Sequence, residues 1–422
     1  MPPAHALRIR DFRQLWAAGA AGGLGAGMLV VAIPAHVYAV TGSVLATGVT
    51  LAFEHLPSLL LGPISGVLAD RWDRRRLMIA TSLAHAAAIS VVLLARTPGT
   101  IWLVYAAALG QGATSVFFRP AVRAHLPAVV GTGPALTSAN TVNAVTTGVV
   151  GLAGPPLGGL LFAVSGVGAA VAAAATAALL AAAAIARTSS RPSPAGASGV
   201  TGSVPAEASG APDSVPSGAV AGSVADAVRE GLSAVRRAPA TRALLASDGI
   251  YLLANAALTA LLIPFGVATL GGSAEVGYLL SALGLGFLLG APISRRLVDR
   301  CAPRRLIAAA QALVGAAFLV MFNSTSLPAA LAAAVLLGLP GVTVLVAVQT
   351  YVQRATPGHL LGRVTAAFLT VEAAVTMTGA FAGPALSELS GLPVALNAAC
   401  AVTLLSSLVT LLLLPPSQRP VR

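Results

Sequence analysis

The chain is built from long apolar runs separated by short polar connections. Each run approaches the roughly 20 residues that a helix needs to cross a bilayer core about 30 Å thick. The runs lack the two-residue alternation of strands, and lipid satisfies no backbone hydrogen bond, so we predict membrane-spanning helices. The twelve predicted spans cover residues 15–39, 46–68, 77–95, 100–118, 136–161, 167–186, 243–268, 275–297, 305–322, 327–349, 364–387 and 393–414.

The second half of the chain repeats short sequences of the first half at a nearly constant offset. Because both copies run in the same direction, we predict an all-α membrane protein with two parallel six-helix pseudo-repeats, residues 1–186 and 242–422. Two such halves can rock against each other around a site between them, which favours a transporter. The matching segments include Ile33-Pro34 with Ile263-Pro264, Asp70-Arg71 with Asp299-Arg300, Arg75-Arg76-Leu77 with Arg304-Arg305-Leu306, and Gly154-Pro155 with Gly383-Pro384.

The segment between the halves, residues 187–241, has a different composition. Residues 187–223 are rich in Ser, Gly, Pro and Ala, which predicts a disordered cytoplasmic linker. Residues 226–237 then place Val228, Leu232 and Val235 among charged residues. This pattern predicts a short amphipathic helix, which lies either on the membrane surface or simply in solvent.

Charge is scarce and unevenly distributed. Charged residues make up 9% of the chain, against about 25% in a soluble domain. All 25 basic residues are arginine, and only Arg96 falls on the outer side when the N-terminus is placed in the cytoplasm. The positive-inside rule therefore predicts a multi-pass protein of the cell membrane with both termini cytoplasmic. Membrane topology thus explains the net charge of +12, and we expect no nucleic-acid partner.

The connection between the second and third spans carries a charged motif. It reads Gly-Val-Leu-Ala-Asp-Arg-Trp-Asp-Arg-Arg-Arg over residues 66–76, and it resembles the loop signature of the major facilitator superfamily. An aspartate at a helix end can hold an arginine or a neighbouring helix N-terminus. The alternative is an ordinary positive-inside loop. The residues we expect to form a cytoplasmic latch are Gly66, Asp70, Arg71 and Arg75 and, in the repeat, Asp299 and Arg300.

The fifth span contains a run of small residues and prolines. The sequence Gly154-Pro155-Pro156-Leu157-Gly158-Gly159 resembles the Gly-Pro-x-x-Gly-Gly motif of the antiporter branch of that superfamily. Small residues permit close helix packing, and proline kinks a helix. The repeat keeps Gly383 and Pro384 but has Ser387 and Glu388 in place of the second glycine pair. The resemblance implies antiport, whereas the residues alone predict helix packing.

Two segments that we interpret as loops, residues 118–121 and 353–357, resemble a drug-efflux branch that includes macrolide and enterobactin exporters. The chain departs from this branch at two positions. Ala108 stands where many exporters have an arginine, and Gly25-Ala26 stands where a Gly-Asp pair is common. Both departures remove residues that proton coupling could use.

Three acidic residues fall inside predicted spans, namely Glu54, Asp248 and Glu372. Ionisable residues in a membrane cost several kcal/mol and therefore indicate function by default. We hypothesise that Glu372 carries the coupling proton, with Glu54 as a second candidate; Glu372 could instead only hydrogen-bond a neighbouring helix. Asp248 is a further candidate that could instead reach the cytoplasm or pair with Arg242.

Other polar residues in the spans have less specific interpretations. Gln111, Asn140, Asn143 and Asn255 could line a substrate cavity or hold helices together, and Asn143 occupies the position equivalent to Glu372 in the first half. We interpret the histidines in the spans, among them His55 and His85, as packed neutral side chains. Glu275 and Glu388 fall at outer helix ends, where we expect them to be solvated.

These features predict an alternating-access secondary transporter that exports a small amphipathic or hydrophobic compound, such as a drug, a natural product or a siderophore, against a flow of protons. The alternatives are an uptake or facilitated carrier of the same fold, or a non-transporting membrane sensor. The sequence lacks the cluster of His, Cys and acidic residues that an enzyme would need at one membrane face. We therefore expect no enzyme activity, no metal and no cofactor; the expected partners are the substrate, protons and the lipid bilayer.

Overall fold

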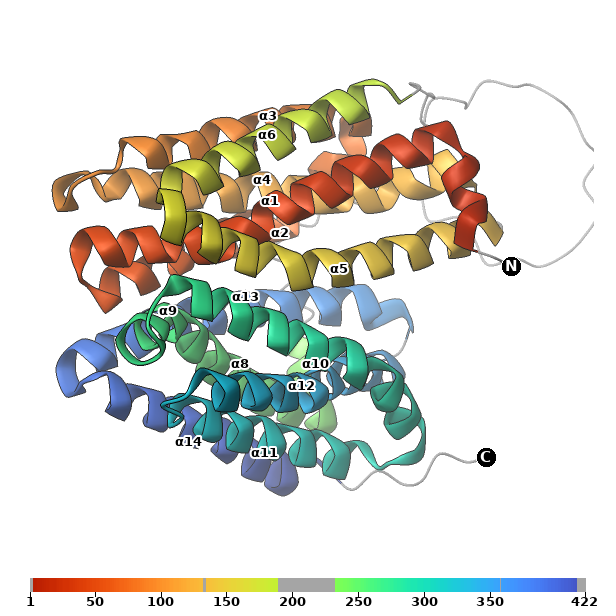
Figure 1. Cartoon of the computed structure of the whole chain (residues 1–422). Helices are drawn as coiled ribbons and strands as arrows, with labels where there is room; N and C mark the ends of the chain where they lie inside the picture. Colours follow the sequence, from red (N-terminus) through yellow and green to blue (C-terminus); the bar gives the residue numbers. More distant parts are fainter. Residues whose placement is uncertain (1–2, 132–133, 189–231, 357, 416–422) are drawn as a thin grey trace, which may run out of the picture.

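A computed structural model describes residues 3–131, 134–188, 232–356 and 358–415 (Figure 1). Its described residues contain twelve helices long and apolar enough to cross a membrane, which confirms the predicted number. The six of the first half are α1 (Arg10–Thr41), α2 (Val44–Arg71), α3 (Arg74–Ser90), α4 (Trp102–Val130), α5 (Pro134–Ser165) and α6 (Val167–Ala186). Short 3₁₀ turns at Pro3–Arg8, Val91–Leu94 and Pro98–Thr100 accompany them.

The second half contains α8 (Pro239–Ala260), α9 (Leu262–Phe265), α10 (Ser273–Arg300), α11 (Pro303–Phe322), α12 (Leu327–Ala355), α13 (Gly358–Ser390) and α14 (Leu392–Leu413). The span predicted over residues 243–268 is divided between α8, α9 and a π-helical turn at Gly266–Leu270. Pro264 lacks the N–H that would bond to the preceding turn, but the equivalent Pro34 lies inside the continuous helix α1, so proline alone does not account for the interruption.

Most helices extend beyond the predicted spans at the end of the molecule where α1 begins. The largest difference is at residues 118–121, which we expected to be a loop. They lie inside α4, which continues through Pro120 and Pro127 to Val130. Hydropathy identifies only the part of a helix that lies in lipid, whereas the backbone continues its hydrogen bonding into water.

The pseudo-repeat appears in turns as well as in helices. Gly42 follows α1 with φ of 65°, and Gly271, at the equivalent position of the second half, follows the π-helical turn with φ of 112°. Both conformations lie in the left-handed region, where glycine has no steric penalty. The first and seventh spans therefore end in the same way.

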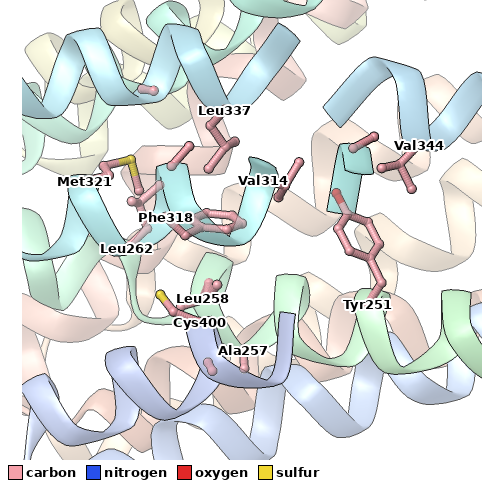
Figure 2. Packing of buried hydrophobic residues seen from close by; sticks show 14 of the residues in the cluster. Tyr251, Ala257, Leu258, Leu262, Val314, Phe318, Met321, Leu337, Val344 and Cys400 are labelled. Atoms are coloured by element: carbon pink, nitrogen blue, oxygen red, sulfur yellow. The ribbon is translucent and has the colours of Figure 1, made fainter. Parts of the chain in front are cut away.

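The described apolar core is divided between the two halves. The largest buried cluster lies mainly among the C-terminal helices and includes Leu258, Val314 and Phe318 (Figure 2), but it also takes in Val31 and Ala35 of α1. Two smaller clusters lie among the N-terminal helices. The C-terminal half also buries a polar network, described next.

The buried network joins α8, α11 and α14. The hydroxyl of Thr410 donates to Gln311 Oε1 at 2.7 Å, and Gln311 Nε2 donates to the Ser247 hydroxyl at 3.3 Å. Ser247 and Thr410 also contact each other directly. A buried polar group is tolerated when it is hydrogen-bonded, so this network holds the three helices together without a large desolvation penalty.

The two halves meet along two antiparallel helix pairs, α2 with α13 and α5 with α10. Gly48 of α2 packs against Ala380 and Pro384 of α13. Gly159 of α5 packs against Ser273 and Ala274 of α10. Both sets of contacts lie toward the end of the molecule where α2 and α10 begin. Figure 1 shows α5 and α10 drawing apart toward the opposite end, where α10 finishes at Arg300.

Candidate functional site

The acidic residue predicted on α2 has a partner on α4. Gln111 Nε2 donates to Glu54 Oε1 at 3.1 Å. Gln111 is only 8% exposed, and its own amide oxygen has no hydrogen-bond partner among the described residues. Gly112 lets the two helices approach, because a methyl group there would overlap the Glu54 carbonyl oxygen. Two residues predicted for separate roles thus form one polar contact.

The other two acidic candidates lie together between α8 and α13. Close contacts pair Gly249 with Val375, Leu253 with Gly379 and Ala257 with Gly383, so the helices are parallel and keep a constant register. This register places Glu372 two residues, or about 3 Å along the axis, from the level of Asp248.

Asp248 is 6% exposed, and the charge of Glu372 acts on it electrostatically. We considered that Asp248 reaches the cytoplasm or pairs with Arg242. Instead, Asp248 is buried, and no ion pair joins it to the exposed Arg242 within the described part of the chain.

Asp248 also interacts electrostatically with Tyr251, one turn further along α8. Figure 2 shows the Tyr251 side chain reaching from α8 toward Val344 of α12. The positions equivalent to Asp248 and Glu372 in the first half are Ala18 and Asn143. The carboxylate pair is therefore a feature of the C-terminal half alone.

The asparagines predicted to line a cavity are scattered. Asn140 is exposed on α5, and Asn143 lies one turn further on, where its carbonyl accepts from the Thr147 hydroxyl at 2.9 Å. The carbonyl of Asn255 on α8 accepts from the Thr259 hydroxyl at 2.8 Å. The described structure brings these asparagine side chains into no common cluster.

A cavity of about 390 Å³ lies instead inside the N-terminal half. Its wall contains Gly22 and Gly23 of α1, and its polar side chains come from α3, α4 and α5. His85 Nδ1 lies 3.3 Å from the Thr114 hydroxyl. We interpreted His85 as a packed histidine, but it lines this space. A feature of the sequence indicates this position: Thr81, Ser82 and His85 are spaced so that they form one polar face of α3.

The Gly-Pro motif of α5 packs on both sides. A methyl group at Gly154 would lie 2.8 Å from Gly27 Cα on α1, and one at Gly158 would overlap Met28. Gly159 and Pro156 instead face α10 of the other half, at Ser273 and Gly277. Pro155 also contacts α10, through its carbonyl oxygen. The motif therefore lies at a contact between the two halves.

The repeat of this motif on α13 has the same arrangement. Gly383 packs against Ala257 of α8 within its own half, and Pro384 packs against Gly48 of α2 in the other half. The two copies of the motif thus form equivalent contacts between the halves, one in the α5–α10 pair and one in the α2–α13 pair. We call these two contacts the glycine-proline joints.

Glu388, which is exposed as we expected, also joins the two halves at the end of the molecule where α2 begins. Glu388 Oε1 of α13 accepts from the Ser43 hydroxyl and the Val44 N–H, both at 3.1 Å, and from the Leu45 N–H at 3.3 Å. The carboxylate thereby caps the first turn of α2. The sequence offered one indication of this role: Glu388 stands where the second glycine pair of the Gly-Pro-x-x-Gly-Gly motif would be.

The cytoplasmic motif forms contacts within each half. Arg75 donates to the carbonyl oxygens of Ile185 and Ala186 at the end of α6. Its counterpart in the repeat, Arg304, donates to the Leu411 carbonyl near the end of α14. An arginine at a helix C-terminus complements the helix dipole, so the repeated arginine ties the third helix of each half to the end of the sixth.

Asp299 of α10 pairs with Arg354 of α12 at 2.9 Å, and both side chains are more than 60% exposed. Arg300 is exposed. The backbone of Gly66, Asp70 and Arg71 belongs to α2, and the side chains of the latter two lie outside the described part of the structure. Among the described residues, hydrogen bonds between the two halves include those of Glu388 and of Ser281 with Leu152, whereas those of Arg75, Arg304 and Asp299 stay within one half.

Comparisons with known proteins agree with this architecture. Residues 2–419 match the family described as transmembrane secretion effector. The chain belongs to this family of major facilitator superfamily transporters. Its members are transporters rather than enzymes, and the twelve spans make the protein a multi-pass membrane protein.

Curated relatives match over part of the chain. Macrolide efflux protein A of Streptococcus pyogenes is 31% identical over 121 residues, which are 28% of this chain and 30% of that protein. An uncharacterized transporter of the superfamily from Bacillus subtilis, YfiS, is 32% identical over 109 residues, 26% of this chain and 25% of that protein. The matched stretches span less than a third of these relatives.

Solved structures share the fold over nearly the whole chain. The nucleoside transporter NupG aligns with a TM-score of 0.72 at 8% identity, covering 95% of this chain and 98% of that one. The human organic anion transporter MFSD10 aligns with a TM-score of 0.58 at 16% identity, covering 97% and 100%. At such identities the likeness establishes the major facilitator fold alone.

Proposed function

We propose that this transporter exports a small amphipathic or hydrophobic compound in exchange for protons, with both termini in the cytoplasm. The acidic pair of buried Asp248 and half-buried Glu372 carries the proposal. The family description and the macrolide efflux relative support the outward direction, and the distribution of arginine supports the orientation.

The carboxylate pair is suited to exchange a proton. Two carboxylates that face each other in a membrane repel when both are charged, and a nearby hydrocarbon phase makes that repulsion costly. Binding one proton relieves it. A cationic or polar substrate arriving at the pair would favour the charged form and release the proton, which couples the two flows.

Glu54 and Gln111 form the second polar centre, in the other half. The amide oxygen of Gln111 is buried without a partner among the described residues, so a donor group on the substrate would reach it only in a conformation that uncovers it. The cavity beside His85 adds hydroxyl groups and an apolar glycine wall. Together they suit a compound with a large apolar body and a few hydrogen-bonding groups.

Alternating access follows from where the halves are joined. Glu388 and the glycine-proline joints close the outer end, so the described conformation faces the cytoplasm. Opening outward requires the α2–α13 and α5–α10 pairs to separate there. The cytoplasmic motif of Gly66, Asp70, Arg71, Arg75, Asp299 and Arg300 would then form the latch that holds the outward-facing state.

Proton flux tests the proposal. Purified protein in liposomes with a pH-sensitive dye is challenged with a panel of hydrophobic drugs and siderophores. We expect one class of compound to dissipate the pH gradient, and Glu372→Gln and Asp248→Asn to abolish that flux. Glu275→Gln, which changes an acid at an outer helix end, is the matched control and should retain it.

Two results would count against the proposal. Full proton-coupled transport by Glu372→Gln would remove the carboxylate pair from the mechanism. Substrate flux that proceeds at the same rate without a pH gradient would identify an uptake or facilitated carrier instead.

A further inference from the structure

A second cavity, of about 630 Å³, lies at the end of the molecule where α10 finishes and α11 begins. Its walls come from α10 and α11, and its floor is formed by Leu339, Pro340 and Thr343 of α12. It is separate from the acidic pair and from the joints between the halves. We propose that this cavity binds an anionic phospholipid of the cytoplasmic leaflet.

The walls of the cavity are apolar and open to the side of the molecule. Ile293 is 50% exposed and Leu313 is 60% exposed, although both lie within membrane spans. Side chains of this kind on a spanning helix face lipid. Leu313 lies ten residues into α11, so the apolar surface reaches about 15 Å into the membrane, half of a bilayer core. One leaflet's acyl chain has this length.

The mouth of the cavity is cationic. Arg300 and Arg305 line it, and neither forms a hydrogen bond or an ion pair with another described residue. Their neighbours differ, because Arg304 is held by the Leu411 carbonyl and Arg354 by Asp299. A pair of uncommitted guanidinium groups above an apolar groove matches the phosphate and the acyl chain of an anionic lipid.

The first half differs at the equivalent place. There Asp73 accepts a hydrogen bond from the Arg76 N–H at 2.7 Å and caps α3. In the second half Ala302 stands at this position, and α11 begins without a side-chain cap. The second half thus lacks both the acidic side chain and the cap, which leaves the positive end of α11 facing the same mouth. The proposal concerns lipid and holds whether or not the transport proposal does; only the name of the leaflet depends on the orientation.

Cys301 provides a reporter, because it lines the cavity and is exposed, whereas Cys400 is buried. Maleimide labelling of Cys301 is measured in detergent with increasing dioleoyl phosphatidylglycerol or dioleoyl phosphatidylcholine. We expect phosphatidylglycerol to protect Cys301 at a mole fraction at least tenfold lower than phosphatidylcholine. Protection is expressed for each variant as the ratio of the labelling rate without lipid to the labelling rate with lipid, because nearby charges alter thiol reactivity.

Variants separate charge from shape. Arg300→Gln with Arg305→Gln should raise the half-protecting mole fraction of phosphatidylglycerol roughly tenfold or more, as expected for two arginines near an anionic surface. Leu313→Trp, which narrows the groove without changing charge, should also weaken protection. Arg295→Gln with Arg296→Gln, exposed on the same helix but outside the cavity lining, is the matched control and should stay within about twofold of the wild type.

Three results would overturn the proposal. Equal protection by the two lipids would show no preference for an anionic headgroup. An equal loss in the Arg295 and Arg296 control would indicate general surface charge. Protection by inorganic phosphate alone, unaffected by Leu313→Trp, would indicate a site for a soluble anion instead of a lipid.

Discussion

Removing the Glu388 carboxylate should open the outer end of the molecule. In the described conformation one oxygen of Glu388 accepts three hydrogen bonds from residues at the start of α2. Glu388 belongs to the C-terminal half and α2 to the N-terminal half. When the outer ends separate, these bonds must break. Glu388→Ala therefore acts on the equilibrium between the two conformations as well as on overall stability.

The size of the effect can be worked from the contacts. A helix cap contributes about 0.5–2 kcal/mol, and hydrogen bonds to a charged group are stronger than neutral ones, but the exposed setting of Glu388 weakens them. Ser43 retains a second bond to the α2 backbone, from the Ala46 N–H at 3.2 Å, so the helix start stays partly capped. We expect a net change of about 1–2 kcal/mol, or a 5- to 30-fold increase in the outward-open fraction.

The assay uses a cysteine that the outer contacts bury. Ser273 is 7% exposed beneath Gly159, so Ser273→Cys in a Cys301→Ser background should react with an impermeant maleimide only when the halves separate. The labelling rate should rise 5- to 30-fold in Glu388→Ala and less in Glu388→Gln, which keeps an acceptor oxygen.

The matched control is Asp73→Ala, which removes an acidic cap that lies within one half. It should leave the labelling rate of Ser273→Cys unchanged. An unchanged rate in Glu388→Ala, or an equal increase in the control, would refute the role of Glu388 as an outer contact between the halves.

Three further substitutions test the packing. Gly158→Ala should lower the free energy of unfolding in detergent by about 1–3 kcal/mol, because its methyl group would overlap Met28. Gly151→Ala on the same helix meets open space and should have little effect. Gln311→Leu should cost about 1–3 kcal/mol by leaving buried hydroxyl groups without their amide partner; an unchanged melting temperature would contradict the buried network. Asp299→Asn should change stability by less than about 1 kcal/mol, since both members of its ion pair are exposed, so slower transport by this variant at normal stability would point to a latch.

Some properties of the protein follow from its sequence alone. The number of spans and the two parallel halves are confirmed, because crossing a membrane requires a long apolar run at each span, and such runs are local features of the chain. The repeat reappears in the arginines that bind the ends of α6 and α14 and in the glycines that follow the first and seventh spans. The glycines depend mainly on their own helix end, whereas the partners of the two arginines lie on another helix and come from the tertiary structure.

The tertiary structure decided which polar residues meet. Glu54 with Gln111, Asp248 with Glu372, and Glu388 with the start of α2 each join residues far apart in the sequence. Hydropathy gives the depth of a residue in a helix but not the direction in which its side chain points. That direction depends on how the helices are rotated, and the rotation is fixed by close contacts of small residues such as Gly154 and Gly383. Only the packed arrangement therefore reveals that the acidic residue at the outer end joins the two halves.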